Sequence, residues 1–392
     1  MRLAIVCLVC AACGASERAA LPAVEAAPTV QRPETKPAPP TPAPASVSVT
    51  TKPEPVTSKP EPQITLLPDR PPRAPVSTAA DHARKDDPPL TEFEGVSVER
   101  IDTFYPDGSL KRRSYVRKNG RSAAIDHGPD VRWHENKEIW IRRNWRSGKQ
   151  QGLFEEWFDN GFLKSRGEFE ADQKSGTWNS WFEGGAPSSE KHFENGVLDG
   201  RAREFYANGQ LRSEIGWKAG KQHGPARNFE ASGQQTLDAN YVDGQRHGPF
   251  REWTVEGALR NEGQYEAGRE VGVWTRIDPE GIKSVESYAQ GVLEGPRSTF
   301  NSGGVKLSEG EYHQGLAVGI QRTFSDKGAK LSEIEYKAGV PEGSFRQFFE
   351  NGQVQVEGAM SHGKRQGQWN YYQPDGRLDP AWSGRYIDDK KQ

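Results

Sequence analysis

Hydrophobic and polar positions along residues 128–392 follow one pattern, which repeats with a period of about 24 residues. Residues 200–224, GRAREFYANGQLRSEIGWKAGKQHG, are a clear copy. They contain a strand with an aromatic end, an Asn-Gly turn, a second strand with an aromatic end, and a Gly-x-x-x-Gly connection. A period held this strictly is typical of proteins built from stacked units. The pattern predicts an all-β fold, an elongated twisted open antiparallel sheet of about 11–12 tandem β-hairpins.

Each copy opens on a glycine, to which we assign position 0. Successive opening glycines are evenly spaced, except that the step from Gly272 to Gly295 is shorter by a single residue. We call the copy that opens at Gly272 the short copy. The opening glycines are Gly128, Gly152, Gly176, Gly200, Gly224, Gly248, Gly272, Gly295, Gly319, Gly343 and Gly367. A degenerate copy precedes them around residues 104–108, so the predicted repeat domain covers residues 99–392.

The turn inside each hairpin has a distinctive composition. A second glycine lies at position 9, as Gly209 does, and Asn, Asp or a similar residue often precedes it. In three copies a proline stands two residues before this glycine: Pro106, Pro279 and Pro374. Proline presets φ for the first turn position and glycine accepts the left-handed one. This combination predicts a three-residue loop, a type I turn closed by a glycine bulge. Lys137 replaces the turn glycine in the copy that opens at Gly128.

This turn predicts which positions share a face of the sheet. Position 5 should pair with position 11, and positions 5, 11 and 17 should then point to the same side. Positions 5 and 17 are aromatic in most copies, as in Trp157, Trp181 and Phe193. We expect two aromatic columns on one face, and we expect this face to be the core.

The opposite face is expected to hold positions 2, 6, 14 and 16. Position 14 is acidic in many copies, as at Glu214. Two interpretations are open: ion pairs across strands, or an acidic stripe that recognises a basic partner or a cation. Aromatic residues at positions 2 and 6 cluster in four copies, and they either bind a ligand or pack at curled sheet ends. These ligand-face candidates are Phe154, Phe158, Trp178, Phe182, Phe345, Phe349 and Trp369.

Residues 1–13, MRLAIVCLVCAAC, have the pattern of a signal peptide. One positive charge precedes an apolar run that is too short to span a bilayer. The small residues before Cys13 and Gly14 after it resemble a bacterial lipobox, although Cys10 stands where leucine is usual. This resemblance implies lipidation of Cys13. The alternatives are ordinary cleavage near Ala15 or Ala20, and an uncleaved tail on a cytoplasmic protein.

Residues 14–98 form a predicted disordered linker. They are rich in proline and nearly free of aromatic residues, so they cannot bury enough apolar surface to offset the entropy of ordering. Proline-rich chain favours an extended conformation, so we interpret the segment as a spacer. Docking of its PxxP-like pieces to a partner is the alternative.

The composition narrows the function classes. The formal net charge is −2, from 52 Lys and Arg against 54 Asp and Glu, which does not indicate nucleic-acid binding. Only 33% of residues are hydrophobic and the mean hydropathy is −0.85, which suits a long disordered segment together with a thin repeat fold better than one large core. All three cysteines lie within residues 1–13, so the repeats can form no disulfide.

The sequence offers no constellation typical of catalysis. It contains no GxSxG, P-loop, HExxH or EF-hand motif. Carboxylates recur in every copy, so no pair stands out as a catalytic dyad. His223 and His247 share a position but lie one repeat apart, which is too far for routine binding of one zinc ion. We therefore predict no enzyme activity, no catalytic residue, no metal site and no cofactor.

Residues 200–224 and 343–367 resemble the MORN repeat, in its bacterial variant form. The shared pattern is Gly-x-Trp/Phe-x-x-Trp/Phe-x-x-x-Gly, followed by Leu-x-x-Glu-x-x-Tyr-x-x-Gly-x-x-x-Gly. The resemblance extends over residues 99–392. It implies an elongated sheet of β-hairpins that contacts proteins or membrane lipids and has no catalytic residues. Similarity to the YwqK-type antitoxin group within this family implies binding of a partner.

From these features we expect a non-enzymatic protein-interaction or scaffolding module, monomeric, with an unidentified protein partner. A lipid on Cys13 would tether it to the bacterial cell envelope. We expect export across the inner membrane and anchoring at the outer membrane, on the periplasmic or the surface side. The alternative function is an antitoxin-like neutraliser that binds a toxin.

Overall fold

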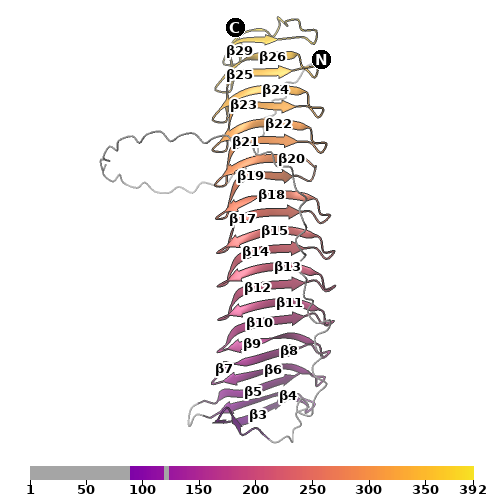
Figure 1. Ribbon diagram of the computed structural model, residues 1–392, viewed down its shortest axis with the longest axis vertical. Coiled ribbons are helices and arrows are strands. Elements are labelled where there is room, and N and C mark those ends of the chain that lie inside the picture. The colour runs from indigo at the N-terminus through magenta and orange to yellow at the C-terminus, as the bar shows by residue number, and fades with distance from the viewer. Residues whose placement is uncertain (1–88, 119–122) are drawn as a thin grey trace, which may run out of the picture. The chain divides into compact units, whose positions relative to one another are not determined.

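All regular structure in the described part of the chain is β-strand. The computed structural model describes residues 89–118 and 123–392, and these contain 29 strands (Figure 1). Among these residues no segment forms a helix that could cross a bilayer. The all-β prediction is therefore confirmed.

The strands follow one another along the chain with short connections. The first fifteen are β1 (Glu92–Phe93), β2 (Val96–Ser97), β3 (Glu99–Phe104), β4 (Leu110–Arg117), β5 (Ile125–Trp133), β6 (Ile139–Arg146), β7 (Lys149–Gln150), β8 (Gly152–Trp157), β9 (Leu163–Glu170), β10 (Gln173–Trp181), β11 (Pro187–Glu194), β12 (Val197–Phe205), β13 (Leu211–Lys218), β14 (Lys221–Phe229) and β15 (Gln235–Val242). The others are β16 (Gln245–Arg246), β17 (Gly248–Trp253), β18 (Leu259–Glu266), β19 (Arg269–Ile277), β20 (Lys283–Ala289), β21 (Val292–Phe300), β22 (Lys306–His313), β23 (Leu316–Phe324), β24 (Lys330–Lys337), β25 (Val340–Phe348), β26 (Val354–Ser361), β27 (Lys364–Tyr371), β28 (Gly384–Ile387) and β29 (Lys390–Lys391).

From β3 onward, neighbours in sequence pair antiparallel in a continuous meander. The short strands β7 and β16 precede β8 and β17, which pair with β6 and β15 in turn. Among the described residues β29 pairs only with β28, and β3 only with β4. The sheet is therefore open, and Figure 1 shows β3 and β29 at opposite ends of a long stack.

The predicted turn inside each hairpin is confirmed. In the copy that opens at Gly200, the backbone N–H of Gly209 donates to the carbonyl of Tyr206 at 2.9 Å, and Gly209 has a φ of 85°. Phe205 pairs with Leu211, as expected. Lys137 makes the same turn without glycine: its N–H donates to the carbonyl of His134 at 3.0 Å, and its φ is 74°.

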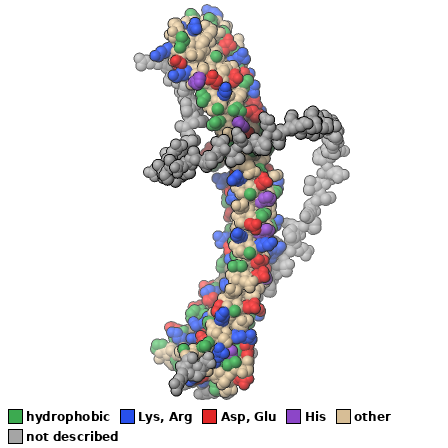
Figure 2. Space-filling view, turned by 90° about the vertical axis from the view of Figure 1, so that its left-hand side faces the viewer, with side chains coloured by type: hydrophobic (Ala, Val, Ile, Leu, Met, Phe, Trp, Pro, Cys, Tyr) green, Lys and Arg blue, Asp and Glu red, His purple; other side chains and the backbone are tan. Residues whose placement is uncertain are grey.

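The connection between hairpins is a two-residue loop. After β13, Lys218 pairs with Lys221, and the intervening Ala219 and Gly220 have φ values of 48° and 77°. Positive φ at both loop residues defines the type I′ turn, whose twist matches the flanking strands. These turns line up along one long side of the sheet, where the strand ends meet. Figure 2 looks onto this side and shows Lys, Arg, Asp and Glu side chains interspersed along it.

Replacing Ala219 with asparagine is expected to raise the free energy of unfolding by about 1 kcal/mol. Asparagine occupies the left-handed region more easily than alanine, and Asn-Gly is a preferred type I′ pair. Urea denaturation would measure the gain. The matched control is Ala231→Asn in the type I turn of the next copy, because Ala231 is also exposed but has no positive φ. Equal effects at both sites would contradict the explanation.

The prediction that positions 5, 11 and 17 share a face is wrong. In the copy at Gly200 the pairing shifts by one residue: Phe205 pairs with Leu211, but Glu204 pairs with Ser213. The extra residue, Arg212, forms a β-bulge. One extra residue turns every following side chain to the other face. Positions 13, 15 and 17 therefore join positions 2 and 4.

We call the surface formed by positions 2, 4, 13, 15 and 17 face 1, and the surface formed by positions 3, 5, 11 and 14 face 2. Apolar clusters occur on both. On face 2, Trp133, Ile139, Trp157 and Leu163 are buried together. On face 1 the buried clusters are Ala239, Phe250 and Trp274, and Val356, Trp369 and Tyr386. Phe193 makes an edge-to-face contact with Trp178 on face 1, at 6.4 Å between ring centroids, and not with Trp157. Because the sheet is a single layer, it has a divided core.

The short copy, which opens at Gly272, lacks the bulge. From Gly272 to Ile277 the strand β19 pairs with β20 without any register shift, and Trp274 pairs with Glu286. Glu286 is thereby moved from face 2 to face 1, where it is 8% exposed. A deletion of one residue has placed a carboxylate among the aromatic side chains.

Position 14 forms ion pairs across strands, as the first of the two interpretations expects, with arginines at position 3. These pairs lie on face 2 together with position 5, so the expectation that position 14 lies opposite position 5 is wrong. Both partners are well exposed in Arg227–Asp238 and Arg251–Glu262, so these two pairs should each contribute less than about 1 kcal/mol. The pairs are Arg203–Glu214 at 3.8 Å, Arg227–Asp238 at 3.5 Å, Arg251–Glu262 at 2.8 Å, Arg322–Glu333 at 3.0 Å and Arg346–Glu357 at 3.8 Å. The charges are reversed at Glu155, which lies 3.6 Å from both Arg142 and Arg166.

The last residues of the predicted linker, just before β3, form regular structure. Residues 92–97 form the hairpin β1–β2, which packs on the first copies through Phe93 and His127, at 5.7 Å between ring centroids. Glu94 and Arg146 form an ion pair at 2.7 Å. The predicted signal peptide at residues 1–13, with Cys13, and the predicted linker up to residue 88 lie outside the described residues.

Candidate binding groove on face 1

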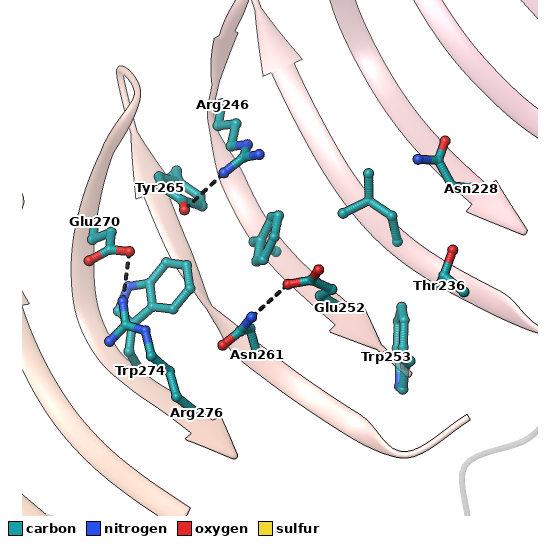
Figure 3. A pocket seen from close by; sticks show the side chains of 12 residues that line it. Asn228, Thr236, Arg246, Glu252, Trp253, Asn261, Tyr265, Glu270, Trp274 and Arg276 are labelled. Carbon is teal, nitrogen blue, oxygen red and sulfur yellow. Dashed lines mark hydrogen bonds and ion pairs between the residues drawn. The ribbon is translucent and has the colours of Figure 1, made fainter. Parts of the chain in front are cut away.

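Three copies in the middle of the sheet form a groove of about 380 Å³ over β14 to β19. Its walls combine aromatic rings with charged and amide side chains (Figure 3). The lining residues are Asn228, Thr236, Leu237, Arg246, Phe250, Glu252, Trp253, Asn261, Tyr265, Glu270, Trp274 and Arg276. Most occupy positions 2, 4, 13 and 17. The bulge brings these positions together, because it places positions 13 and 17 of the second strand on the same face as positions 2 and 4 of the first.

Arg246 forms one wall of the groove. Its guanidinium lies 5.0 Å from the ring centroid of Phe250 and 5.3 Å from that of Tyr265. It donates hydrogen bonds to the hydroxyls of Tyr265 at 3.1 Å and of Tyr241 at 3.4 Å. The hydrogen bond to Tyr241 is the largest cause of a raised pKa at Arg246, so this side chain is a fixed positive charge.

Arg276 forms the facing wall. It stacks over Trp274 at 4.9 Å and donates to Glu270 at 2.7 Å and to Glu286 at 2.5 Å. Glu286 also accepts hydrogen bonds from Arg297 at 2.9 Å and from Tyr288 at 3.0 Å. Burial raises the pKa of Glu286, but these hydrogen bonds and the charges of both arginines outweigh it, so its pKa lies below the ordinary value.

Glu286 is expected to stabilise this region only above acidic pH. Because its pKa in the folded state is depressed, its contribution is complete above the ordinary value of 4.5 and is lost as the pH falls through the folded-state value. At about pH 7, Glu286→Gln should cost about 2 kcal/mol. Urea denaturation of both proteins between about pH 7 and pH 3 would show this difference shrinking below pH 4.5. A difference that stays constant over this range would contradict the assignment.

Glu252 lies in the middle of the groove. Its carboxylate accepts a hydrogen bond from the amide of Asn261 at 2.6 Å, and no ion pair of Glu252 occurs among the described residues. Figure 3 shows Glu252 and Asn261 between the Arg246 side and Trp253. The groove therefore offers an uncompensated carboxylate, a fixed cation and flat rings, a combination suited to binding polar and basic side chains.

The structure places the predicted ligand-face residues in two settings. Trp178 and Trp369 are only 6% and 2% exposed and belong to the core of face 1. Phe154 and Phe345 are half-buried and pack against them, at 5.5 and 5.1 Å between ring centroids. Phe158, Phe182 and Phe349 are half-buried beside the turns. A ligand-binding role for these seven residues stays a prediction.

Arg246, Glu252 and Arg276 were not predicted from the sequence. Polar residues recur at position 4, which Glu252 and Arg276 occupy, and this is the signal available for those two; Arg246, at position 22 after the two-residue loop, has no such signal. The signal at position 4 carried no weight because positions 4 and 17 were expected on opposite faces. Within the described part of the chain, no group of three or more His, Cys, Asp or Glu side chains could hold a metal ion.

Comparison with known proteins adds a family resemblance at two places. The model of the family described as MORN repeat variant matches residues 198–219 and 341–359. A comparison with curated proteins finds no match. Three solved structures are similar in part: TcdB2-TccC3 without its hypervariable C-terminal region, TcdB2-TccC3-Cdc42, and the Photorhabdus luminescens Tc holotoxin pore.

These three likenesses are distant. The sequence identities are 11%, 10% and 12%, and the TM-scores are 0.15, 0.14 and 0.14. They cover 76%, 72% and 74% of this chain but only 18%, 18% and 19% of the other chains. This chain spans less than a fifth of those proteins, and scores this low support no argument. The match to the family model supports a narrower conclusion: the chain carries MORN-type repeat sequences at residues 198–219 and 341–359.

Proposed function

We propose that residues 89–392 act as a non-enzymatic scaffold that binds a partner protein through the groove on face 1. The observation that carries the proposal is Glu252, a carboxylate without an ion pair among the described residues, set between aromatic rings and a fixed guanidinium. A single-layer sheet offers area and shallow grooves, and the MORN-type repeats support a protein-binding role.

The finer proposal concerns location. A lipid on Cys13 would tether the scaffold to the bacterial envelope, at the outer membrane, and the proline-rich segment would hold it away from the lipid surface. Labelling cells with a fatty-acid analogue tests this directly. The wild-type chain should incorporate the label and Cys13→Ala should not. Label retained by Cys13→Ala would contradict anchoring at this residue.

The binding proposal is tested by cross-linking the full chain in cells and comparing two variants. Arg246→Ala with Glu252→Ala alters the groove while leaving the buried Phe250 and Trp274 in place. Arg251→Ala is the matched control, because Arg251 lies between Arg246 and Glu252 in the sequence but points to face 2. Partner capture should be lost in the first variant and kept in the second. Equal capture by both would overturn the proposal.

The same experiment separates the two functions. Capture of several envelope proteins favours a scaffold. Capture of a single protein whose toxicity the chain suppresses favours the antitoxin-like alternative, which rests on resemblance to a family group that implies a bound partner.

A further inference from the structure

A fully buried carboxylate lies at the N-terminal end of face 1, far from the groove in sequence. Asp130 on β5 is 0% exposed and occupies position 2, where most other copies place tryptophan or phenylalanine. Its Oδ1 and Oδ2 accept hydrogen bonds from Nε and Nη2 of Arg112, at 3.0 and 3.2 Å. Oδ2 also accepts from Nε and Nη2 of Arg143, at 3.1 and 3.0 Å, and from Nε1 of Trp145 at 3.2 Å.

A third arginine at this cluster, Arg132, makes no hydrogen bond through its side chain to any described residue. Arg132 comes no closer to Asp130 than 3.6 Å, and its buried Nε has no partner among the described residues. Its side chain is 30% exposed, so Nε is removed from water while the rest of the guanidinium stays partly accessible. An unsatisfied buried donor destabilises the folded state, and more so when it is charged.

The strand register makes this arrangement more costly. Arg112 on β4 and Arg132 on β5 are directly opposite each other in the antiparallel ladder. Like charges at such a pair are about 4.5–5.5 Å apart at Cβ and repel. The nearby acidic groups are Asp130 and Asp126, the second lying 3.6 Å from Arg112 and 36% exposed. Three guanidinium groups thus face two carboxylates, and positive charge is in excess.

We propose that Arg112 and Arg132 form a binding site for an oxyanion, a carboxylate or phosphate group. Both side chains are about one-third exposed, at 31% and 30%, so an anion can reach them from solvent. Asp130 accepts two hydrogen bonds from Arg112 and thereby fixes the position of its guanidinium. The bound anion supplies the hydrogen-bond acceptor that Nε of Arg132 lacks. Planar guanidinium groups bind such oxygens in bidentate fashion. Burial, together with the charges of Arg132 and Arg112, lowers the pKa of Arg143, which agrees with excess positive charge here.

Titration of the full chain with sodium phosphate and with sodium acetate tests the proposal. Isothermal calorimetry and the thermal unfolding midpoint are recorded at low ionic strength, with sodium chloride at matched ionic strength as reference. We expect saturable binding of phosphate, acetate or both, with a rise in the midpoint that chloride does not reproduce. Binding of acetate identifies a carboxylate source as sufficient, whereas binding of phosphate alone identifies a phosphate-bearing ligand.

Two variants at Arg132 and one control on face 2 locate the site. Arg132→Gln should weaken binding at least about tenfold, because it removes the guanidinium whose Nε has no hydrogen-bond acceptor. Arg251→Gln on face 2 should bind like the wild type. Arg132→Lys keeps the charge without the planar fork and should bind with intermediate affinity, which separates recognition from simple charge. No saturable response in the wild type, or an unchanged affinity in Arg132→Gln, would overturn the proposal.

Discussion

An Asp130→Asn variant is expected to destabilise the first repeats by about 3–5 kcal/mol. The carboxylate is fully buried and accepts five hydrogen bonds, from Arg112, Arg143 and Trp145. Burial raises the pKa of Asp130, but the hydrogen bond from Arg112 and the charges of the arginines hold it below its ordinary value, so the group is ionised. An amide of the same size removes this buried counter-charge and leaves guanidinium groups to repel one another.

Hydrogen exchange followed by mass spectrometry suits this test, since repeat arrays lose stability locally. Faster exchange should appear in β4, β5 and β6 and should leave β21 to β27 unchanged. The matched control is Asp238→Asn on face 2, where the carboxylate is 39% exposed and its Arg227 partner lies 3.5 Å away. That change should cost less than about 1 kcal/mol. Similar losses at both sites would show that burial of Asp130 contributes little.

A Gly263→Ala variant is expected to cost about 3 kcal/mol. A Cβ atom at Gly263 would lie 2.2 Å from Cδ2 and 2.3 Å from Cε2 of Trp274, because the indole ring rests on the glycine backbone. Trp274 is 1% exposed and packs edge-to-face with Tyr265 at 5.0 Å and at a tilt against Phe250 at 5.8 Å between ring centroids. The ring can make room only by breaking these contacts.

Near-ultraviolet circular dichroism and urea denaturation would report the loss of ring packing and of stability. Gly184→Ala is the matched control: this glycine also has no positive φ, and an added Cβ would meet nothing within 4 Å. It should be neutral within about 0.5 kcal/mol. A Cβ atom added at Gly167 would likewise lie 2.2 Å from Cδ2 of Trp178, so Gly167→Ala should repeat the effect. A Gly263→Ala protein with native stability would refute this account of glycine at position 15.

The sequence by itself determined the features that depend on neighbouring residues. Prolines and glycines around Gly209 and its equivalents specify the type I turn, since they fix or permit particular φ values. This type I turn then sets the pairing of Phe205 with Leu211. The constant period predicted a long stack of hairpins, because a repeated unit that cannot bury its own apolar side chains must pack on its neighbours.

Only the tertiary structure decided which face each aromatic column occupies. The β-bulge at Arg212 turns the side chains that follow it in the second strand to the other face of the sheet. A polar residue at position 12 gives no sign in the sequence that it is the bulged residue. The short copy held the single clue, since the residue that it lacks is the one that bulges elsewhere.

Cross-strand placement likewise decided the binding surfaces. The carboxylate of Glu252 lies among side chains of three copies, and Arg132 stands opposite Arg112 only because β4 and β5 pair in this register. Local sequence controls turns because turn geometry is a matter of a few dihedral angles. It does not control side-chain partners across strands, because one bulge in a strand exchanges the two faces for all residues that follow.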